Sequence, residues 1–507
     1  MARALDLPVQ RVGLMDALIA EYRATGTLAG LPQGHWIDGR FCAAVSGRRM
    51  DSADPGTGRT WLQFAAGDAD DVALAVESSE RAQRGPWRAT LPAERGRILQ
   101  RAAQGVLAQL ERLAVIETLD NGKTLAEARA DIRATARAFE YYAGIADKLQ
   151  GDSIPLGPDY LSVTTLEPVG VTAHVVPWNY PASTMARSVA PALAAGCTAV
   201  VKPAEQTPIS ALLLAQILHD AGLPPGVCNV VTGTGAQAGA PLVAHPAVRH
   251  VTFTGSVGTG SRVMQAAAQQ IASVTLELGG KSPAVVLADA DIDRAAADVA
   301  GGIFYNAGQT CSAGSRLVVE RAVHARFVAQ LVRHAQALHW GHGLRGPAMG
   351  AITSLEQQLR IAAHVDGARA RGVPVLCGGV PAVDPQTGLG WFYPPTVLDA
   401  VPADDAVVQE EIFGPVLVVQ VADSPEHALA LANGTRFGLA AGIYTRDLQR
   451  ALQLARDIDA GQVYVNEYYA GGVETPFGGN RQSGFGRERG LEGLRSYLRT
   501  KCTTVRI

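Results

Sequence analysis

The stretch VGVTAHVV, residues 169–176, begins a repeating pattern that decides the fold. Similar short runs, rich in valine and threonine, recur at TAVVK (198–202), VCNVVTG (227–233), HVTFTG (250–255), SVTLEL (273–278) and SPAVVLA (282–288). Alanine-rich segments separate these runs, and helices are expected at 181–195, 208–221 and 256–269. Strands that alternate with helices are typical of βαβ units, so the pattern predicts an α/β fold with a parallel sheet.

The rest of the chain predicts further elements. A second α/β stretch is expected from Asp291 to about Gly442, with strands near SRLVVE (315–320) and PVLVVQV (415–421). The last residues, SYLRTKCTTVRI (496–507), read as an exposed strand, and the alternating segment DYLSVTTLEPVG (159–170) could pair with it. Near the N-terminus, Leu14, Leu18 and Ile19 lie near helical spacing and predict a short amphipathic helix.

Composition excludes several classes of protein. The 507 residues allow two to four domains, and 47% hydrophobic residues allow a large core. A net charge of −3 provides no basic field for nucleic acid, and no apolar run is long enough to span a bilayer. The N-terminal residues lack the features of a secretory signal. Six scattered cysteines without metal-ligand spacing argue against a disulfide framework and a zinc site, so a cytoplasmic protein without a metal is expected.

One cysteine lies in a setting that suits a nucleophile. In FYNAGQTCSAGSR (304–316), Cys311 stands between Thr310 and Ser312, and Gly308 and Gly314 allow the backbone to turn tightly around it. A nucleophilic cysteine needs access and polar neighbours, whereas a structural cysteine is usually surrounded by apolar residues. The competing interpretation is an unreactive free cysteine in a surface loop.

Two other polar residues follow predicted strands. Glu277 closes the strand SVTLEL and precedes two glycines, a position where open α/β sheets place active sites and where desolvation would suit a general base. Asn179, in VVPWNYP (175–181), lies between a strand and a helix, and its amide could stabilise an oxyanion together with the Cys311 N–H. The alternatives are a salt-bridged strand-end glutamate and a helix-capping asparagine.

Two βα turns have features of a dinucleotide site. KPAEQTP (202–208) carries Lys202 and Glu205, where a carboxylate that binds ribose hydroxyls would repel a 2′-phosphate. FTGSVGTG (253–260) opens a helix, and its glycines Gly255 and Gly260 would leave room for a phosphate near Ser256. This turn does not match the GxGxxG fingerprint and is weak evidence by itself.

Together with EEIFGPV (410–416) and ETPFGGNRQSGFGRE (474–488), these motifs resemble the aldehyde dehydrogenase superfamily, from about His35 to the C-terminus. The resemblance implies catalytic roles for Cys311 as nucleophile, Glu277 as general base, Asn179 as oxyanion donor and Glu488 as a secondary carboxylate. It implies cofactor contacts for Pro177, Trp178, Lys202, Glu205, Gly255, Ser256, Gly260, Leu278, Glu411 and Phe413. The expected reaction is oxidation of an aldehyde to the acid with NAD, with NADP less favoured because of Glu205.

The resemblance also implies a division into parts. Residues 1–34 are an extension, 35–150 and 170–279 form a Rossmann-type cofactor domain, and 280–485 form a catalytic domain. Residues 151–169 and 486–507 form a small β element for oligomerisation, so a homodimer or homotetramer is expected.

The substrate is expected to contact a pocket with one arginine. Arg187, eight residues after Asn179, resembles the residue with which succinate-semialdehyde dehydrogenases bind a carboxylate, which predicts a carboxylate-bearing semialdehyde. Tyr305 departs from that branch. An aromatic lining of Tyr180, Tyr305, Tyr468, Tyr469 and Phe477 would instead suit a betaine-aldehyde-like or broad-specificity enzyme. In a third interpretation, Arg187 pairs with a neighbouring acid such as Glu474.

Three other classes share some of these features. A CoA-acylating dehydrogenase would not need Glu277 to activate water. A non-catalytic binding protein would be free to lose Cys311, Glu277 or Asn179. A cysteine hydrolase would need a histidine partner for the thiol, and none of the eleven histidines lies in a comparable motif.

Overall fold

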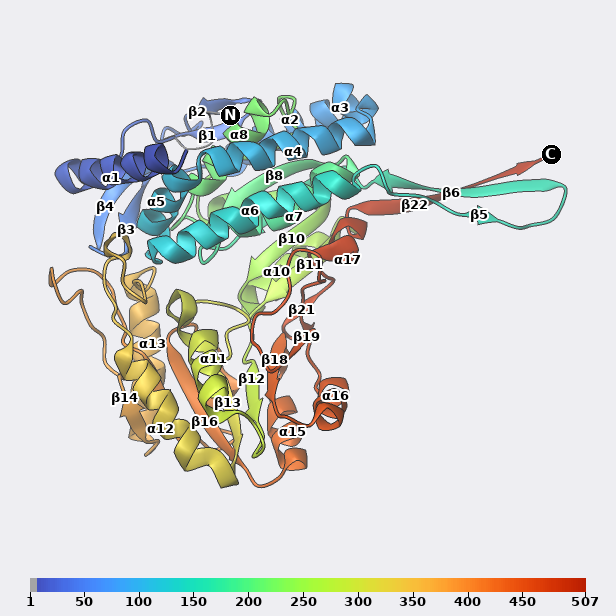
Figure 1. Cartoon of the computed structure of the whole chain (residues 1–507). Coiled ribbons are helices and arrows are strands. Elements are labelled where there is room, and N and C mark those ends of the chain that lie inside the picture. The colour runs from blue at the N-terminus through green and yellow to red at the C-terminus, as the bar shows by residue number, and fades with distance from the viewer. Residues whose placement is uncertain (1–6) are drawn as a thin grey trace, which may run out of the picture.

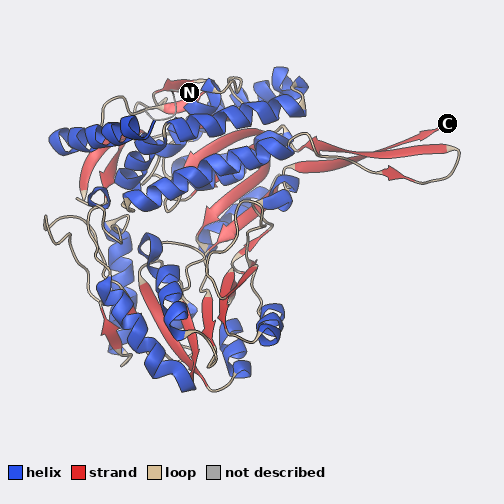
Figure 2. Cartoon of the chain, in the orientation of Figure 1, coloured by secondary structure: helices blue, strands red, loops and turns tan. Residues whose placement is uncertain are grey.

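The molecule consists of two α/β lobes and a projecting arm (Figure 1). The computed structural model describes the backbone from residue 7 and side chains from residue 13 to the C-terminus. Each lobe is built on one sheet covered by helices, and the arm is made almost entirely of strands (Figure 2). The predicted α/β class is confirmed.

The first lobe contains an eight-stranded sheet whose centre is parallel. Its order is β2 (Arg40–Cys42), β1 (His35–Ile37), β9 (Cys228–Val230), β8 (Thr198–Pro203), β7 (Val171–Val176), β10 (Val248–Gly255), β11 (Ser273–Leu278) and β21 (Gly484–Phe485). The five strands from β9 to β11 run parallel, and antiparallel strands close both edges. Five of the six runs that predicted a parallel sheet therefore form this centre.

Helices cover both faces of this sheet. The three predicted helices form as α7 (Pro181–Ala195), α8 (Ile209–Asp220) and α10 (Val257–Ala268), and others are α2 (Ala69–Arg84), α3 (Pro86–Ala89), α4 (Pro92–Ala108), α5 (Leu110–Asn121), α6 (Leu125–Ile145) and α9 (Ala240–Ala244). On β8, Ala199 and Val201 face the core beneath α4–α8, whereas Val200 faces the core beneath α2, α9 and α10. Burial on both faces explains why the strands read as continuous apolar runs.

The N-terminal segment packs onto the first lobe. The predicted helix forms as α1 (Leu7–Thr25), on which Ile19 is buried and Leu18 is partly buried, whereas Leu14, expected on the same apolar face, is exposed. Leu28 and Leu31 continue into the same core as Ile19. From residue 13 onward, the predicted extension is therefore an integral part of this lobe.

The second lobe contains a seven-stranded sheet. Its order is β14 (Val375–Cys377), β15 (Thr396–Leu398), β16 (Val416–Ala422), β13 (Arg316–Glu320), β12 (Pro283–Val286), β18 (Ala440–Tyr444) and β19 (Gln462–Val465), parallel except for β14. Its helices are α11 (Ile292–Phe304), α12 (Arg321–Ala337), α13 (Leu355–Ala370), α14 (Ala406–Gln409), α15 (Pro425–Asn433) and α16 (Leu448–Asp457). The predicted strands SRLVVE and PVLVVQV appear as β13 and β16. The run SPAVVLA forms β12 and belongs here, not to the first sheet.

The arm confirms the predicted pairing of two distant segments. Strand β22 (Leu498–Arg506) runs antiparallel to β6 (Tyr160–Pro168), and β5 (Ser153–Ile154) pairs with the other side of β6. Of the predicted segment 486–507, only the part from Leu498 onward lies in the arm, because the preceding α17 (Gly490–Arg495) packs against α7. Two short pairs complete the fold, β3 (Arg49–Asp54) with β4 (Arg59–Ala65) and β17 (Phe437–Gly438) with β20 (Asn480–Arg481).

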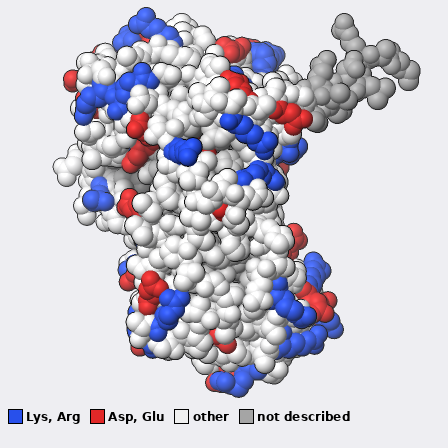
Figure 3. Space-filling model, turned by 90° about the vertical axis from the view of Figure 1, so that its left-hand side faces the viewer, with Lys and Arg blue, Asp and Glu red and all other residues white. Residues whose placement is uncertain are grey.

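The surface drawn in Figure 3 carries charges of both signs in separate groups, and a largely uncharged band crosses its middle. On this face, neither sign forms a continuous field of the kind that attracts nucleic acid. Among the described residues, every helix is too short or too polar to cross a bilayer.

Two buried histidines predict a loss of stability in acid. His174 on β7 and His250 on β10 flank the ring of Tyr497, and each is held by a neutral hydroxyl, from Thr172 and Ser273 respectively. Burial lowers the pKa of His174 to about 3 and that of His250 to about 4. Below pH ~6.5 the unfolded chain binds protons that the folded chain does not, so each histidine should cost about 1.4 kcal/mol of unfolding free energy per unit of pH.

We expect the urea midpoint to fall between pH 7 and pH 5, and to fall less in a His250→Gln variant, which keeps a polar side chain but does not titrate. A variant at the exposed His339 should behave as the parent. Equal pH dependence in the parent and in His250→Gln would contradict the assignment.

Candidate active site

A cavity of about 140 Å³ lies where residues of the two lobes meet. Nine of the predicted site residues line it: Pro177, Trp178, Asn179, Gly255, Ser256, Glu277, Cys311, Glu411 and Phe413. Four further residues complete the lining: Thr254, Gly279, Gln357 and Arg360. The structure therefore brings together residues that the sequence disperses over more than two hundred positions.

The parallel strands of the first lobe place several of these residues. Asn179 follows the carboxyl end of β7, Ser256 follows that of β10, and Glu277 is the penultimate residue of β11. Because neighbouring parallel strands end at the same edge, these three side chains converge there. Cys311 arrives from the second lobe, on the loop between α11 and β13.

The Cys311 loop is folded tightly against the second lobe. Asn306, Ala307 and Gly308 all have positive φ (50°, 52° and 70°), so the chain reverses within three residues. A Cβ at Gly308 would lie 2.1 Å from the carbonyl oxygen of Gly414, so only glycine fits. Burial raises the pKa of Cys311 to about 11. The thiol is therefore protonated near neutral pH in this state, and nucleophilic attack requires its proton to be removed.

The Asn179 amide has one hydrogen available for a ligand. Its Nδ2 donates one hydrogen bond to the Gln309 carbonyl, at 3.0 Å, which leaves the second hydrogen free. The Cys311 N–H donates no hydrogen bond within the described part of the chain. These two donors are available for the two-donor arrangement expected for an oxyanion.

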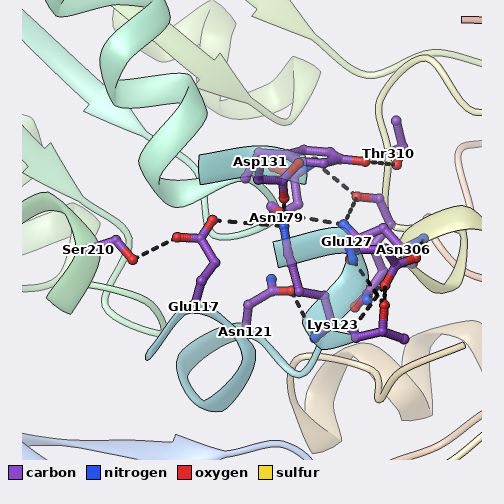
Figure 4. A network of polar contacts seen from close by, with 12 residues as sticks. Glu117, Asn121, Lys123, Glu127, Asp131, Asn179, Ser210, Asn306 and Thr310 are labelled. Atoms are coloured by element: carbon purple, nitrogen blue, oxygen red, sulfur yellow. Dashed lines mark hydrogen bonds and ion pairs between the residues drawn. The ribbon is translucent and has the colours of Figure 1, made fainter. Parts of the chain in front are cut away.

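A buried lysine holds the backbone behind Asn179 (Figure 4). Lys123 donates to the Asn179 carbonyl oxygen, at 2.9 Å, and forms ion pairs with Asp131 and Glu117. Asn306 donates to the same carbonyl oxygen, at 3.2 Å. This network joins the Asn179 turn to the Cys311 loop, and the Lys123 side chain is fully buried.

Replacing Lys123 by methionine should destabilise the protein and weaken catalysis together. The change leaves Asp131 and Glu117 buried without their cation, a loss of about 3–5 kcal/mol in cases of this kind. We expect a lower Tm and a reduced kcat, because the Asn179 turn loses an anchor. The matched control is Lys148→Met at an exposed lysine. An unchanged Tm for Lys123→Met would contradict this interpretation.

Glu277 lies in a pocket that gives it no hydrogen-bond donor. Among the described residues, neither of its carboxylate oxygens accepts a hydrogen bond. A Cβ on Gly478 would lie 2.7 Å from Glu277 Oε1, so the glycine allows close packing against the carboxylate. Burial, followed by the negative charge of Glu488, raises the pKa of Glu277 well above its usual range. An unpaired, desolvated carboxylate of this kind suits a general base.

Arg187 pairs with an acid, but this acid is not the expected Glu474. Its guanidinium forms a buried ion pair with Glu488, and lies 5.2 Å from the centre of the Phe477 ring. Glu474 is exposed and pairs with Arg137 instead. The suggestion that Arg187 pairs with an acid is confirmed, but Glu474 is the wrong partner, because it lies on the surface near α6.

The residues expected to contact the cofactor fall into two groups. Trp178 and Phe413 meet edge to face, 5.2 Å apart, and Glu411 accepts the Gly280 N–H, at 2.9 Å. Burial raises the pKa of Glu411 to about 7. Lys202 and Glu205 lie outside the cavity lining and form an ion pair of 2.9 Å.

The glycines of the turn before α10 make room for neighbouring side chains. Ser256 caps the helix by accepting the Thr259 N–H. A Cβ on Gly260 would lie 2.4 Å from the side chain of Leu278, so this glycine makes room for a neighbouring side chain. A Cβ on Gly255 would similarly meet the Phe253 ring, at 2.6 Å. These contacts give a structural reason for glycine at both positions, and the expected room for a phosphate stays a prediction.

The predicted aromatic lining is partly engaged in internal contacts. Tyr180 hydrogen-bonds Thr310, at 2.7 Å, and the Lys123 ammonium lies 4.3 Å from its ring centre. The rings of Tyr305 and Tyr469 stand 6.3 Å apart, and the Tyr469 hydroxyl donates to a backbone carbonyl. Tyr468 is buried and donates to the Ser312 carbonyl, next to Cys311.

Sequence reasoning missed several residues of the site. Gln357 and Arg360 line the cavity from α13, whose sequence contains no recognisable motif. Lys123 precedes the Thr124–Glu127 capping box of α6, a pattern that signals a helix start but not a contact with a distant turn. Glu127 also accepts the Asn306 N–H, at 2.7 Å, so the same box supports the Cys311 loop.

Comparisons with known proteins agree with this arrangement. The model of the aldehyde dehydrogenase family matches residues 41–503. Betaine aldehyde dehydrogenase of Bacillus subtilis is 38% identical over 475 residues, 93% of this chain and 97% of that protein. Hydroxyisobutyraldehyde dehydrogenase of Mycolicibacterium austroafricanum is 41% identical over 476 residues, 94% of each chain. An aldehyde dehydrogenase of Bacillus cereus, solved as its NAD+ complex, is 40% identical with a TM-score of 0.92, covering 94% of this chain and 96% of that one. The chain thus belongs to the aldehyde dehydrogenase family and is an enzyme that oxidises aldehydes to acids.

Proposed function

We propose that this enzyme oxidises its aldehyde with NAD+ through a covalent intermediate on Cys311. The observation that carries the proposal is the single cavity in which Cys311, Glu277 and Asn179 meet. These groups supply a nucleophile, a base and an oxyanion donor, the three functions that thioester chemistry requires.

The residues around the cavity fit a nicotinamide dinucleotide. Trp178, Phe413 and Glu411 would hold the nicotinamide ribose and ring, the helix N-terminus at Ser256 would face the pyrophosphate, and Lys202 with Glu205 would bind the adenine ribose. Glu205 favours NAD+ over NADP+ because its carboxylate would repel a 2′-phosphate. When bound, NAD+ accepts the hydride.

The protein groups account for the remaining steps. Once the Cys311 thiol has lost its proton to solvent, the thiolate attacks the aldehyde carbon, and the Asn179 amide with the Cys311 N–H stabilises the resulting alkoxide. Loss of hydride from the thiohemiacetal carbon leaves a thioester on Cys311. Glu277 takes a proton from water, the water oxygen bonds to the thioester carbon, and the acid leaves as the Cys311 sulfur is released.

Two substrate classes remain as proposals. The carboxylate-bearing semialdehyde requires Arg187 to exchange Glu488 for the substrate carboxylate, because the two residues form an ion pair. The aromatic rings of Tyr305 and Tyr469 favour the alternative, an aldehyde with either a cationic trimethylammonium group or an uncharged tail, since cations and apolar groups both pack on such faces. The Bacillus subtilis relative carries the name of a betaine aldehyde dehydrogenase.

A substrate panel tests the proposal directly. NADH formation should be measured with a semialdehyde, its carboxylate-free analogue and betaine aldehyde, each with NAD+ and with NADP+. Turnover with NAD+ that CoA does not accelerate supports hydrolysis of the thioester. Acceleration by CoA would instead favour an acylating enzyme.

The arm supports a proposal about assembly. Its exposed apolar side chains include Leu161, Val505 and Ile507, which would be covered if β5, β6 and β22 met a second copy of the chain. We infer a homodimer or homotetramer, and light scattering of the purified chain measures this directly.

A further inference from the structure

A buried ion pair lies near the proposed base. Arg187, in α7, pairs with Glu488, and their side chains are only 12% and 3% exposed. The same guanidinium donates to the Thr254 hydroxyl, at 3.4 Å. Thr254 on β10 is paired in register with Glu277 on β11. Arg187 therefore reaches the neighbourhood of both carboxylates but binds one of them.

The environment separates the two carboxylates into different roles. Glu488 has the Arg187 guanidinium as its counter-ion, whereas Glu277 forms neither an ion pair nor a hydrogen bond among the described residues. When two buried carboxylates share one cation, the paired one stays ionised and the unpaired one becomes the stronger base.

Other charged groups near Glu277 are already committed. Arg487 donates to the carbonyl oxygens of Gly479 and Gly486 and to the Asn480 side chain. Arg489 stacks 4.8 Å from the Phe477 ring centre, on the ring that also contacts Arg187. Cys311 is the remaining titratable group that interacts with Glu277.

We propose that Arg187 is a positioning residue whose ion pair with Glu488 keeps Glu277 unpaired and available to accept the proton of the hydrolytic water. In this role Arg187 does not anchor a substrate carboxylate. The inference rests on the proposed function of Glu277, and it assigns the arginine to the hydrolysis step and not to substrate recognition.

Removing one partner at a time should shift the acid limb of the pH–rate profile for thioester hydrolysis. The two single variants should shift this limb in opposite directions. In Glu488→Gln, Arg187 is released and turns to Glu277, so the limb moves down by about one pH unit and the plateau rate falls because the base is weaker. In Arg187→Met, Glu277 and Glu488 share the site without this cation, so the limb moves up by a similar amount. The double variant, which removes both charges, should return toward the parent.

The measurement is the steady-state rate that follows the NADH burst, recorded from pH 6 to pH 9. Arg187→Lys should restore the parental limb in part, because it keeps the charge. Thermal unfolding of each variant identifies changes that come only from misfolding. If the ion pair were purely structural, all variants would have a lower Tm and kcat, and the acid limbs of their pH–rate profiles would not move in opposite directions. That result would overturn the proposal.

Substrate dependence provides a second test of the proposal. Arg187→Met should change kcat/KM equally, within about threefold, for a semialdehyde and for an uncharged aldehyde of the same length. A loss confined to the semialdehyde, about 100-fold or more, would make Arg187 the carboxylate anchor and overturn the inference.

A third readout separates this inference from the proposed function. Iodoacetamide alkylation of Cys311 needs neither aldehyde nor cofactor, and Arg187 lies close enough to lower the pKa of the thiol. The pH range in which the alkylation rate rises should move to higher pH in Arg187→Met and to lower pH in Glu488→Gln. Wild-type protein that forms no NADH with any aldehyde would contradict the proposed function, whereas an unmoved pH range of alkylation would contradict only the ion-pair assignment.

Discussion

Replacing Cys311 by serine should lower aldehyde oxidation by at least about 1,000-fold while leaving NAD+ binding unchanged. A serine hydroxyl is far less acidic than a thiol, and no histidine lines the cavity to activate it. Without attack on the aldehyde no thiohemiacetal forms, so neither a burst nor a steady-state phase of NADH should be seen. Binding is measured by quenching of tryptophan fluorescence, since Trp178 lines the cavity.

The matched control is Cys502→Ser, because Cys502 is a free thiol on the exposed strand β22, far from the cavity lining. It should retain parental activity. A Cys311→Ser variant that oxidised aldehydes at the parental rate would show that the nucleophile lies elsewhere. Loss of NAD+ binding together with activity would instead indicate that the loop as a whole had been disturbed.

Replacing Glu277 by glutamine should block the second half of the reaction and spare the first. Attack by Cys311 and loss of hydride do not require the base for water, so one equivalent of NADH per active site should appear in a burst. The steady-state rate should then fall by about 100–1,000-fold, because the thioester is no longer hydrolysed efficiently. Stopped-flow absorbance of the reduced nicotinamide separates the two phases.

Two further measurements sharpen this test. Hydroxylamine, a nucleophile that does not need a base, should restore turnover in Glu277→Gln by cleaving the thioester. Glu474→Gln is the matched control, because Glu474 is an exposed glutamate paired with Arg137. If the burst and the steady state declined in parallel, Glu277 would act before the thioester forms, for example on the Cys311 thiol.

Much of the site was predictable because its residues lie in local patterns. Asn179 and Ser256 each follow a strand and Glu277 lies at the end of one, and residues at the carboxyl ends of parallel strands converge whatever the details of packing. The pairing of β6 with β22 was predictable from alternation alone. Gln357 and Arg360 were not, since a helix face carries no local sign of the cavity that it borders.

The explanations for individual residues were less predictable than their positions. Gly260 was expected to leave room for a phosphate, and the structure adds a reason that the sequence did not show, because the missing Cβ accommodates the Leu278 side chain. Lys123 lies outside every motif, yet it holds the Asn179 carbonyl from within the core. In both cases the contacting residue belongs to another element, and the sequence separation of the two residues does not show that they lie close together in space.

The sequence by itself determined the α/β fold, the aldehyde dehydrogenase resemblance and the set of chemical groups, because strand periodicity and turn chemistry are local properties. Only the tertiary structure decided which charges are paired. Arg187 could have contacted a substrate carboxylate, Glu474 or Glu488, and the packing of α7 against the C-terminal segment selects Glu488. A buried charge takes the partner that packing places nearest, and that choice leaves Glu277 as the unpaired carboxylate beside Cys311.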